Sequence, residues 1–199
     1  MEKPSSPWKT RGFKTAVALI VVVVIVAAAV AFLPAQPPPR PVFTDPQNDA
    51  MRNLGSDYAA VIDITSVSLE RTGNTLTLAI YGRQDSFAPS SDEFARWNML
   101  LVLEKGNSIV KTYEIAAEVN STGTHGYVLN LEDESTRDCE VKLVRNQLTV
   151  SMTLDGLQDA DRADWSISST YEKLVDGSLV ASANDFAPDA GTSATSFKP

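Results

Sequence analysis

The sequence predicts an all-β fold: an antiparallel β-sandwich of about eight strands, preceded by one N-terminal transmembrane helix. Three observations lead to this class. Short runs of alternating apolar and polar residues follow one another along most of the chain, as in strands with one buried face. Turn-forming residues separate these runs, and no segment has the periodicity of a long amphipathic helix. One uncharged apolar run stands apart near the N-terminus.

That apolar run, residues 15–33 (TAVALIVVVVIVAAAVAFL), predicts the transmembrane helix. Nineteen helical residues extend over about 28 Å, close to the hydrocarbon thickness of a bilayer. Its β-branched residues disfavour a helix in water, but in lipid the backbone must satisfy its own hydrogen bonds. The alternative is a cleaved signal peptide with its cleavage site at residues 29–31 (AVA). Because the run is longer than the apolar part of a signal peptide, we favour an uncleaved signal-anchor.

Charge assigns a side of the membrane to each end. The chain carries 17 basic and 25 acidic side chains, for a net charge of −8. Residues 1–14 hold four of the basic groups against one acidic group, so they are expected to form a cytoplasmic tail. The acidic remainder is then extracytoplasmic. It lacks the clustered Lys and Arg that phosphate binding requires, which excludes nucleic acid as a partner.

Three further regions follow the anchor. Residues 34–46 (PAQPPPRPVFTDP) are rich in proline and predict a semi-rigid polyproline II stalk. Residues 47–191 are expected to form the β-sandwich ectodomain. Residues 192–199 are small and polar, and predict a flexible tail.

Within the ectodomain, period-2 alternation predicts four strands with one buried face: TLTLAIY (75–81), YVLNL (127–131), QLTVSMT (147–153) and WSISSTY (165–171). NMLLVLE (98–104) is apolar on both faces and predicts a central strand, followed by a longer one in IVKTYEIAAEV (109–119). In VIDITSVSL (61–69) the alternation changes phase, which predicts a bulge near Thr65 and Ser66.

Turns and two short helices complete the element list. The segments TGN, KGN and RN, at residues 72–74, 105–107 and 145–146, predict hairpin turns. Residues 91–97 and 158–163 are the two segments that look helical.

The two ends of the ectodomain carry a family resemblance. DPQNDA (45–50) precedes DITSVSLERTGNTLTLAI (63–80), and WSISSTYEK (165–173) is followed by NDFAPDAG (184–191). This order resembles extracytoplasmic β-sandwiches related to the family 9 carbohydrate-binding modules and DOMON-type domains. The resemblance covers residues 45–191 and departs from the usual pattern at Ala50 and Met51. It implies a ligand-binding or interaction sandwich, often with a structural calcium ion near the termini.

The same resemblance implies the calcium ligands Asp45, Asp49, Asp185 and Asp189. Calcium takes about six to eight hard oxygen ligands, and carboxylates on two adjacent segments can supply several of them. The alternative is that each aspartate caps a turn or precedes a proline for backbone reasons.

Aromatic residues are the candidates for contact with a ligand, because sugars bind to flat apolar faces flanked by hydrogen-bonding groups. Trp165 and Tyr171 lie in phase with the apolar positions of their strand and are expected in the core. Trp97 follows a polar loop and is expected to be exposed. The candidate ligand-binding patch, suited to a glycan or to a protein partner, consists of Trp97, Phe94 and Phe87.

No constellation in the sequence predicts catalysis. The lone Cys139 and the lone His125 exclude an intramolecular disulfide, a Cys-rich zinc site and a cluster of histidine ligands. No nucleophile elbow, Walker loop or dinucleotide fingerprint is present. Cys139 lies in phase with Val141 and is expected to be buried. Asn120, in the sequon Asn-Ser-Thr, is a predicted glycosylation site.

The sequence therefore predicts a non-catalytic, membrane-anchored extracytoplasmic binding or interaction module, which recognises an envelope or extracellular glycan. The alternative is a structural accessory subunit of a membrane or cell-envelope protein complex. Small residues along the predicted anchor, which suit close helix packing, slightly favour this alternative.

Overall fold

A computed structural model describes residues 43–197, except 48, 55–58, 84–86 and 189–194. These residues belong to one compact unit, Pro39–Pro199. The predicted cytoplasmic tail (1–14), the predicted anchor (15–33) and residues 34–42 of the predicted stalk lie outside the described residues. No helix within the described part is long and apolar enough to cross a membrane.

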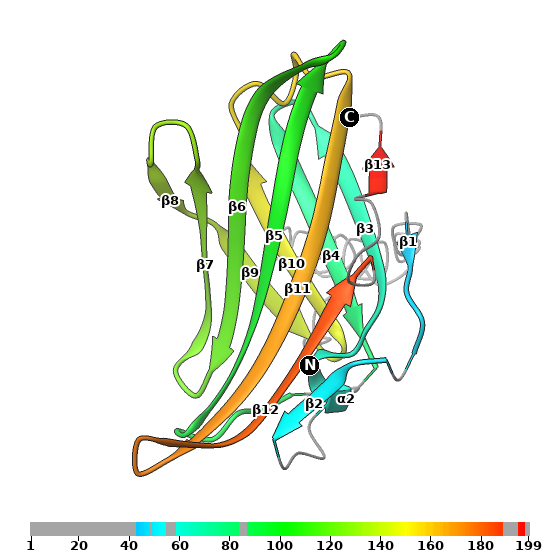
Figure 1. Cartoon of the computed structure of the whole chain (residues 1–199). Coiled ribbons are helices and arrows are strands. Elements are labelled where there is room, and N and C mark those ends of the chain that lie inside the picture. Colours follow the sequence, from blue (N-terminus) through cyan, green and yellow to red (C-terminus); the bar gives the residue numbers. More distant parts are fainter. Residues whose placement is uncertain (1–42, 48, 55–58, 84–86, 189–194, 198–199) are drawn as a thin grey trace, which may run out of the picture. The chain divides into compact units, whose positions relative to one another are not determined.

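Two antiparallel sheets form the domain (Figure 1). The small sheet has the order β1-β3-β4-β10-β9, with β1 Phe43–Thr44, β3 Ile64–Thr72, β4 Thr75–Gly82, β10 Gln147–Thr153 and β9 Glu140–Val144. The large sheet has the order β2-β12-β11-β5-β6-β7-β8, with β2 Met51–Leu54, β12 Ser178–Ala187, β11 Arg162–Val175, β5 Glu93–Lys105, β6 Ser108–Asn120, β7 Gly123–Asn130 and β8 Thr136–Asp138. The predicted all-β antiparallel fold of two packed sheets is confirmed.

The four period-2 segments fall in strands, and in three of these strands, β4, β10 and β11, the apolar positions face the space between the sheets. In residues 127–131 the predicted buried face is wrong: Tyr127 and Leu131 are exposed, whereas Val128 and Asn130 are buried. In β10, Leu148, Val150 and Met152 are buried while the residues between them are partly exposed. Trp165 and Tyr171 of β11 are buried, at 1% and 0% exposed, as predicted. Burial of one face of each sheet against the other is the main source of stability in such a fold.

The predicted bulge is also present, because the pairing of β3 with β4 shifts register between Ile64 and Ser66. The three predicted hairpin turns occur where expected. Gly73, Gly106 and Arg145 adopt positive φ angles of 61°, 61° and 57° there, as tight turns between strands require.

Both helical predictions are wrong. Residues 93–97 begin β5, which pairs with β11 on one side and β6 on the other, so two strand ladders override the local pattern. Residues 158–163 form a turn and then the start of β11. The helix of the described part is α2 (Ala59–Ile62), which lies where the sequence suggested the beginning of a strand.

The domain has more strands than the eight or so that were expected. Some of the additional strands are short and lie at its ends. Phe43 and Thr44, assigned to the stalk, pair with β3 as β1. Strand β13 (Thr195–Phe197), within the predicted flexible tail, pairs with Ala163–Trp165 of β11. Segments of two to four residues are too short for an alternation to be recognised in the sequence.

Between β8 and β9 the chain crosses from the large sheet to the small sheet (Figure 1). Cys139 lies at the crossing, where its N–H donates to the carbonyl oxygen of Gly126 on β7 at 3.1 Å. Gly126 permits this close approach, since a Cβ there would lie 2.3 Å from Val141 Cγ2 and 2.8 Å from Cys139 Sγ.

Candidate functional site

The structure brings together three of the four predicted calcium ligands. Asp45 follows β1, Asp49 precedes β2, and Asp185 lies on β12. One carboxylate oxygen from each lies within 4.8 Å of the other two. Asp45 and Asp185 are each only 3% exposed, whereas Asp49 is exposed. Asp189, the fourth predicted ligand, lies outside the described residues.

The beginning of β3 holds this cluster in position. The backbone N–H of Ile64 donates to Asp185 Oδ2 at 2.6 Å, and the N–H of Asp45 donates to the carbonyl oxygen of Thr65 at 3.0 Å. Since β3 belongs to the small sheet and β12 to the large sheet, these bonds place the carboxylates where the two sheets meet.

The electrostatics of the cluster suit a cation. Burial raises the pKa of Asp185 to about 6, and the neighbouring carboxylates of Asp49 and Asp63 act in the same direction, while backbone N–H donors oppose them. Asp63 is 1% exposed and pairs with Arg83 at 3.6 Å. A hard divalent ion fits such a set of oxygen donors because it offsets their mutual repulsion. Asp63 was not among the predicted ligands, although its position directly before an apolar strand was an available signal.

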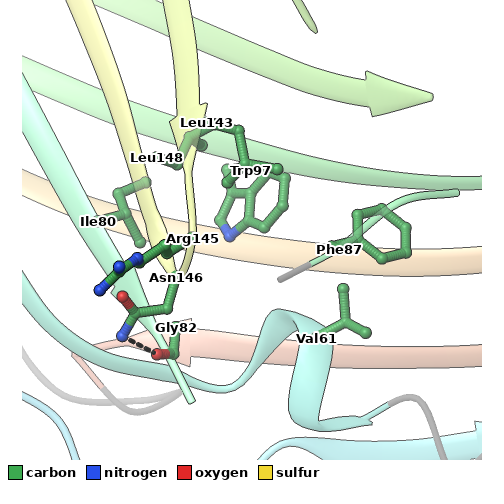
Figure 2. Close-up of a pocket in the computed structure, with 9 residues that line it drawn as sticks. All are labelled: Val61, Ile80, Gly82, Phe87, Trp97, Leu143, Arg145, Asn146 and Leu148. Carbon is green, nitrogen blue, oxygen red and sulfur yellow. Dashed lines mark hydrogen bonds between the residues drawn. The ribbon is translucent and has the colours of Figure 1, made fainter. Parts of the chain in front are cut away.

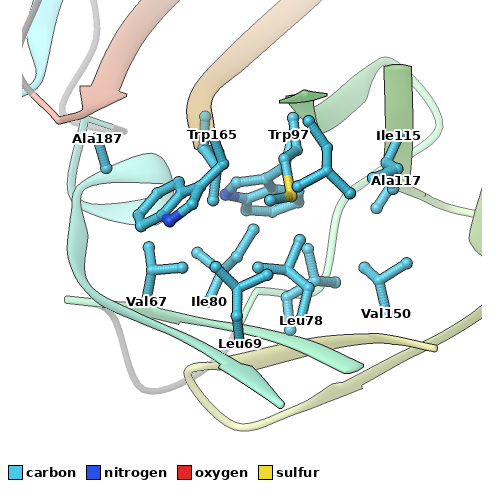
Figure 3. Close-up of a cluster of buried hydrophobic side chains, with 14 of the residues drawn as sticks. Val67, Leu69, Leu78, Ile80, Trp97, Ile115, Ala117, Val150, Trp165 and Ala187 are labelled. Atoms are coloured by element: carbon cyan, nitrogen blue, oxygen red, sulfur yellow. The ribbon is translucent and has the colours of Figure 1, made fainter. Parts of the chain in front are cut away.

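The three aromatic residues predicted to form one exposed patch do not form one: Trp97 and Phe87 line a small internal cavity, and Phe94 lies apart from them. Trp97 points inward from β5 and is only 6% exposed, so the expectation that it is exposed is wrong. It lines a cavity of about 20 Å³ together with Phe87, Leu143 and Asn146 (Figure 2). This volume holds about one water molecule, so the cavity has no room for a sugar ring. Figure 3 shows Trp97 beside Trp165, facing Leu78 and Ile80 of the small sheet.

Phe94 lies on the opposite, outer face of the large sheet, with the guanidinium carbon of Arg96 6.0 Å from its ring centroid. The patch was predicted because Trp97 follows a polar loop, but residues 93–97 already belong to β5. Residues three apart, such as Phe94 and Trp97, share a face on a helix but point to opposite faces of a strand.

A groove of about 330 Å³ opens beside the crossing between β8 and β9, where β9 begins at Glu140 and β10 continues beyond it to Thr153. No pattern in the sequence predicts this groove, because it depends on where the chain changes sheets. Val128 and Met152 supply its apolar wall, and the remaining lining residues are polar: Thr75, Arg137, Asp138, Cys139, Glu140, Ser151 and Thr153.

The charged groups of the groove are largely paired, whereas its hydroxyl groups are available. Arg137 pairs with Asp155 at 3.3 Å, and Glu140 pairs with Lys142 at 2.6 Å. Within the described part of the chain, no hydrogen bond is found for three hydroxyls that line the groove, those of Thr75, Ser151 and Thr153. The groove therefore offers neutral donors and acceptors beside an apolar wall.

Cys139 is half-buried in the wall of this groove rather than fully buried. Burial raises the pKa of its thiol to about 11, and Asp138 acts in the same direction. The group therefore stays protonated at neutral pH and is a weak nucleophile.

The predicted glycosylation site, Asn120, is the last residue of β6 and opens the turn into β7. Its side chain is half-buried, while Ser121 and Thr122 of the sequon are exposed. The sequon thus lies at the surface of the domain.

A comparison with known protein families gives no match, and a comparison with curated proteins gives none either. The two antiparallel sheets are compatible with a β-sandwich. The finer resemblance to family 9 carbohydrate-binding modules and DOMON-type domains remains a hypothesis.

Proposed function

We propose that the chain is a non-catalytic, membrane-anchored extracytoplasmic binding module, and that it recognises an envelope or extracellular glycan through the groove beside Cys139. The composition of the groove supports this proposal. Glycan hydroxyls both donate and accept hydrogen bonds, as the hydroxyls of Ser151 and Thr153 do. Val128 and Met152 give an apolar surface for the carbon-bound hydrogens of a sugar ring.

The size and charge of the groove limit the class of ligand that it can bind. A volume of about 330 Å³ is at the lower end of the range of small-molecule sites, about 300–1,000 Å³, so the groove suits a terminal sugar or a short unit. Asp138, for which the described residues show no ion pair, is negative and disfavours an anionic sugar. A neutral glycan is therefore the preferred class.

Cys139 provides a direct test, because it is the sole cysteine of the chain and lies in the groove wall. A neutral glycan that binds on a glycan array should slow the reaction of Cys139 with a thiol reagent at alkaline pH. Ser151→Ala and Thr153→Ala should each weaken the affinity for the glycan, and the protection of Cys139 that it gives, by about tenfold. The reason is that each substitution removes one to two hydrogen bonds. Thr77→Ala is the matched control, because Thr77 is opposite Ser151 on β4 but does not line the groove. Glycan binding that leaves Cys139 unprotected, or no binding to any glycan, would contradict the proposed site.

A structural calcium ion is part of the proposal. Asp45, Asp49 and Asp185 would hold it, with Asp189 as the fourth ligand that the family resemblance implies. Its role would be to stabilise the junction of the two sheets rather than to take part in chemistry. Support comes from the convergence of three carboxylates from segments far apart in the sequence.

The accessory-subunit alternative is supported by exposed apolar side chains at one end of the large sheet. Six of the eleven large apolar side chains that are exposed in the described residues gather there, on β2 and the β11–β12 hairpin: Met51, Leu54, Leu174, Val175, Leu179 and Val180. Asp176 and Gly177, both with positive φ, form the tight turn at the hairpin tip. Clustered exposed apolar residues are typical of contacts with other proteins.

Purification of the full chain from its native membrane in mild detergent tests this alternative. Stoichiometric companion proteins, lost on Leu179→Asp, would support an accessory subunit. Ile109→Asp, at the exposed tip of the β5–β6 hairpin, is the matched control and should retain them. A chain that purifies alone would contradict the alternative.

A further inference from the structure

The turn between β6 and β7 fixes the amide group of Asn120. Asn120 Oδ1 accepts hydrogen bonds from the N–H of Thr122 at 2.9 Å and from its hydroxyl at 2.6 Å. Asn120 Nδ2 donates to Glu118 Oε1 at 2.9 Å. Glu118 is itself held by Arg96, whose Nη2 lies 2.7 Å from Glu118 Oε2. The oxygen and the nitrogen of the amide therefore have distinct, assigned directions.

The two cross-strand neighbours of Asn120 leave room for a group attached to Nδ2. Gly123 is opposite on β7, where a Cβ would meet no atom within 4 Å. Phe94 is opposite on β5, on the same outer face of the large sheet, and its ring is half-exposed. Directly opposite side chains on adjacent strands lie in contact range, so a group on Asn120 reaches the Phe94 ring.

We propose that Asn120 carries an N-linked glycan and that its first sugar packs against the ring of Phe94. The inference rests on the extracytoplasmic location in the proposed function. In the modification, Asn120 Nδ2 forms a bond to the anomeric carbon of a sugar activated as a lipid-linked phosphate. The bond between that carbon and the phosphate oxygen breaks, the lipid phosphate leaves with the electron pair, and Nδ2 loses one proton.

The folded turn accommodates this product. An amide nitrogen carries two hydrogens, so the one that remains keeps the hydrogen bond to Glu118. Both bonds from Thr122 go to the amide oxygen, which the modification leaves unchanged. Phe94, whose ring is half-exposed, then acquires an apolar contact with the attached sugar ring.

Mass mapping of the full chain, isolated from the membranes of its native host, tests the modification. Trypsin releases Asn120 in a peptide of residues 112–137, because the flanking basic residues are Lys111 and Arg137. We expect this peptide to be heavier than its sequence by the mass of a glycan. Thr122→Ser, which keeps the sequon, should retain the added mass. Asn120→Gln and Thr122→Ala should remove it.

Labelling of intact cells with a membrane-impermeant amine reagent separates this inference from the proposed function. The side chain of Lys142 is 65% exposed and reports on the location of the domain. Labelled Lys142 with an unmodified peptide would overturn the glycan while leaving the extracytoplasmic location intact. Unlabelled Lys142 with an unmodified peptide would overturn both. Labelled Lys142 with a heavier peptide supports both.

The contact with Phe94 has its own readout. The glycosylated chain should have a Tm about 2–4 °C above that of the same chain produced in a host without N-glycosylation. Phe94→Ala should remove more than half of this difference, whereas Tyr127→Ala, on the same face but at a distance from the sequon, should not change it. If glycosylation raises the Tm of the Phe94→Ala chain as much as that of the native chain, the sugar does not pack on this ring.

Discussion

Glu93, the first residue of β5, connects the loop before it to β11. Its carboxylate accepts hydrogen bonds from the N–H of Ser90 at 3.0 Å, from Lys173 Nζ at 3.0 Å and from the hydroxyl of Tyr171 at 3.1 Å. These bonds, led by that from Ser90, lower the pKa of Glu93 from 4.5 to about 2, against the opposing effect of burial. The pKa of Glu93 is lower in the folded chain than in the unfolded chain. Its contribution to the free energy of unfolding is therefore complete above about pH 4.5 and is lost as the pH falls towards 2.

Glu93→Gln should therefore lower the free energy of unfolding by about 1–2 kcal/mol at pH 7 and flatten its decline between pH 4.5 and pH 2. Urea titrations at several pH values measure both effects. Glu70→Gln, an exposed position on β3, is the control and should leave the pH profile unchanged. A Glu93→Gln variant with the native acid profile would show that these bonds do not set the pKa.

The aspartate cluster gives a second prediction at the residue scale. Addition of Ca²⁺ after chelation should raise the Tm, because an ion that binds only the folded state stabilises it by mass action. Asp49→Asn should abolish most of this increase without loss of the fold, because Asp49 is the exposed member of the cluster. Asp176→Asn, at the tip of the β11–β12 hairpin, should leave the increase intact. An unchanged Tm with Ca²⁺ in the native chain would contradict a calcium site there.

At the scale of elements, the crossing between β8 and β9 depends on Gly126. Gly126→Ala places a Cβ within 2.8 Å of both Val141 and Cys139 side chains, so the crossing segment must move away from β7. We expect a loss of about 1–3 kcal/mol in the free energy of unfolding. We also expect faster reaction of Cys139 with a thiol reagent, as the groove wall opens.

Gly82→Ala on β4 is the matched control for this prediction. The closest atom to a Cβ at Gly82 is the carbonyl oxygen of Val61 at 3.5 Å, which is an ordinary contact. The stability of this variant should change by less than about 1 kcal/mol, and its thiol reactivity should be native. Equal losses in both variants would mean that the replacement of any strand glycine, rather than the close approach at the crossing, is responsible.

At the scale of the whole molecule, the sequence specifies the strands better than the surfaces they form. Alternation along single segments, as in residues 147–153, places Leu148, Val150 and Met152 in the core without knowledge of their partners. The groove beside Cys139 and the apolar end of the large sheet arise only from pairing between distant segments. No local pattern encodes them.

The candidate sites also depend on pairing between distant segments. Three of the four predicted calcium ligands lie together, and they could be predicted because a resemblance at both ends of the domain supplied the long-range pairing that periodicity lacks. The aromatic patch is not formed because the segment before Trp97 was expected to be a loop, whereas residues 93–97 belong to β5 and alternate between its two faces. Pairing of β5 with strands on both sides determines the outcome, and this pairing is not visible in the segment itself.

The proposed location in the membrane depends on the first 33 residues, and it gives the last prediction. If residues 15–33 anchor the chain, it should stay with the membrane pellet after an alkaline wash and leave it only with detergent. Replacement of the four basic residues of the tail by glutamate should invert the chain, because basic residues near the span set its orientation: Lys3, Lys9, Arg11 and Lys14. Protease added to intact cells should then digest the ectodomain of the native chain but not that of the variant. A chain that lacks about the first thirty residues and is found in the medium would instead identify a cleaved signal peptide.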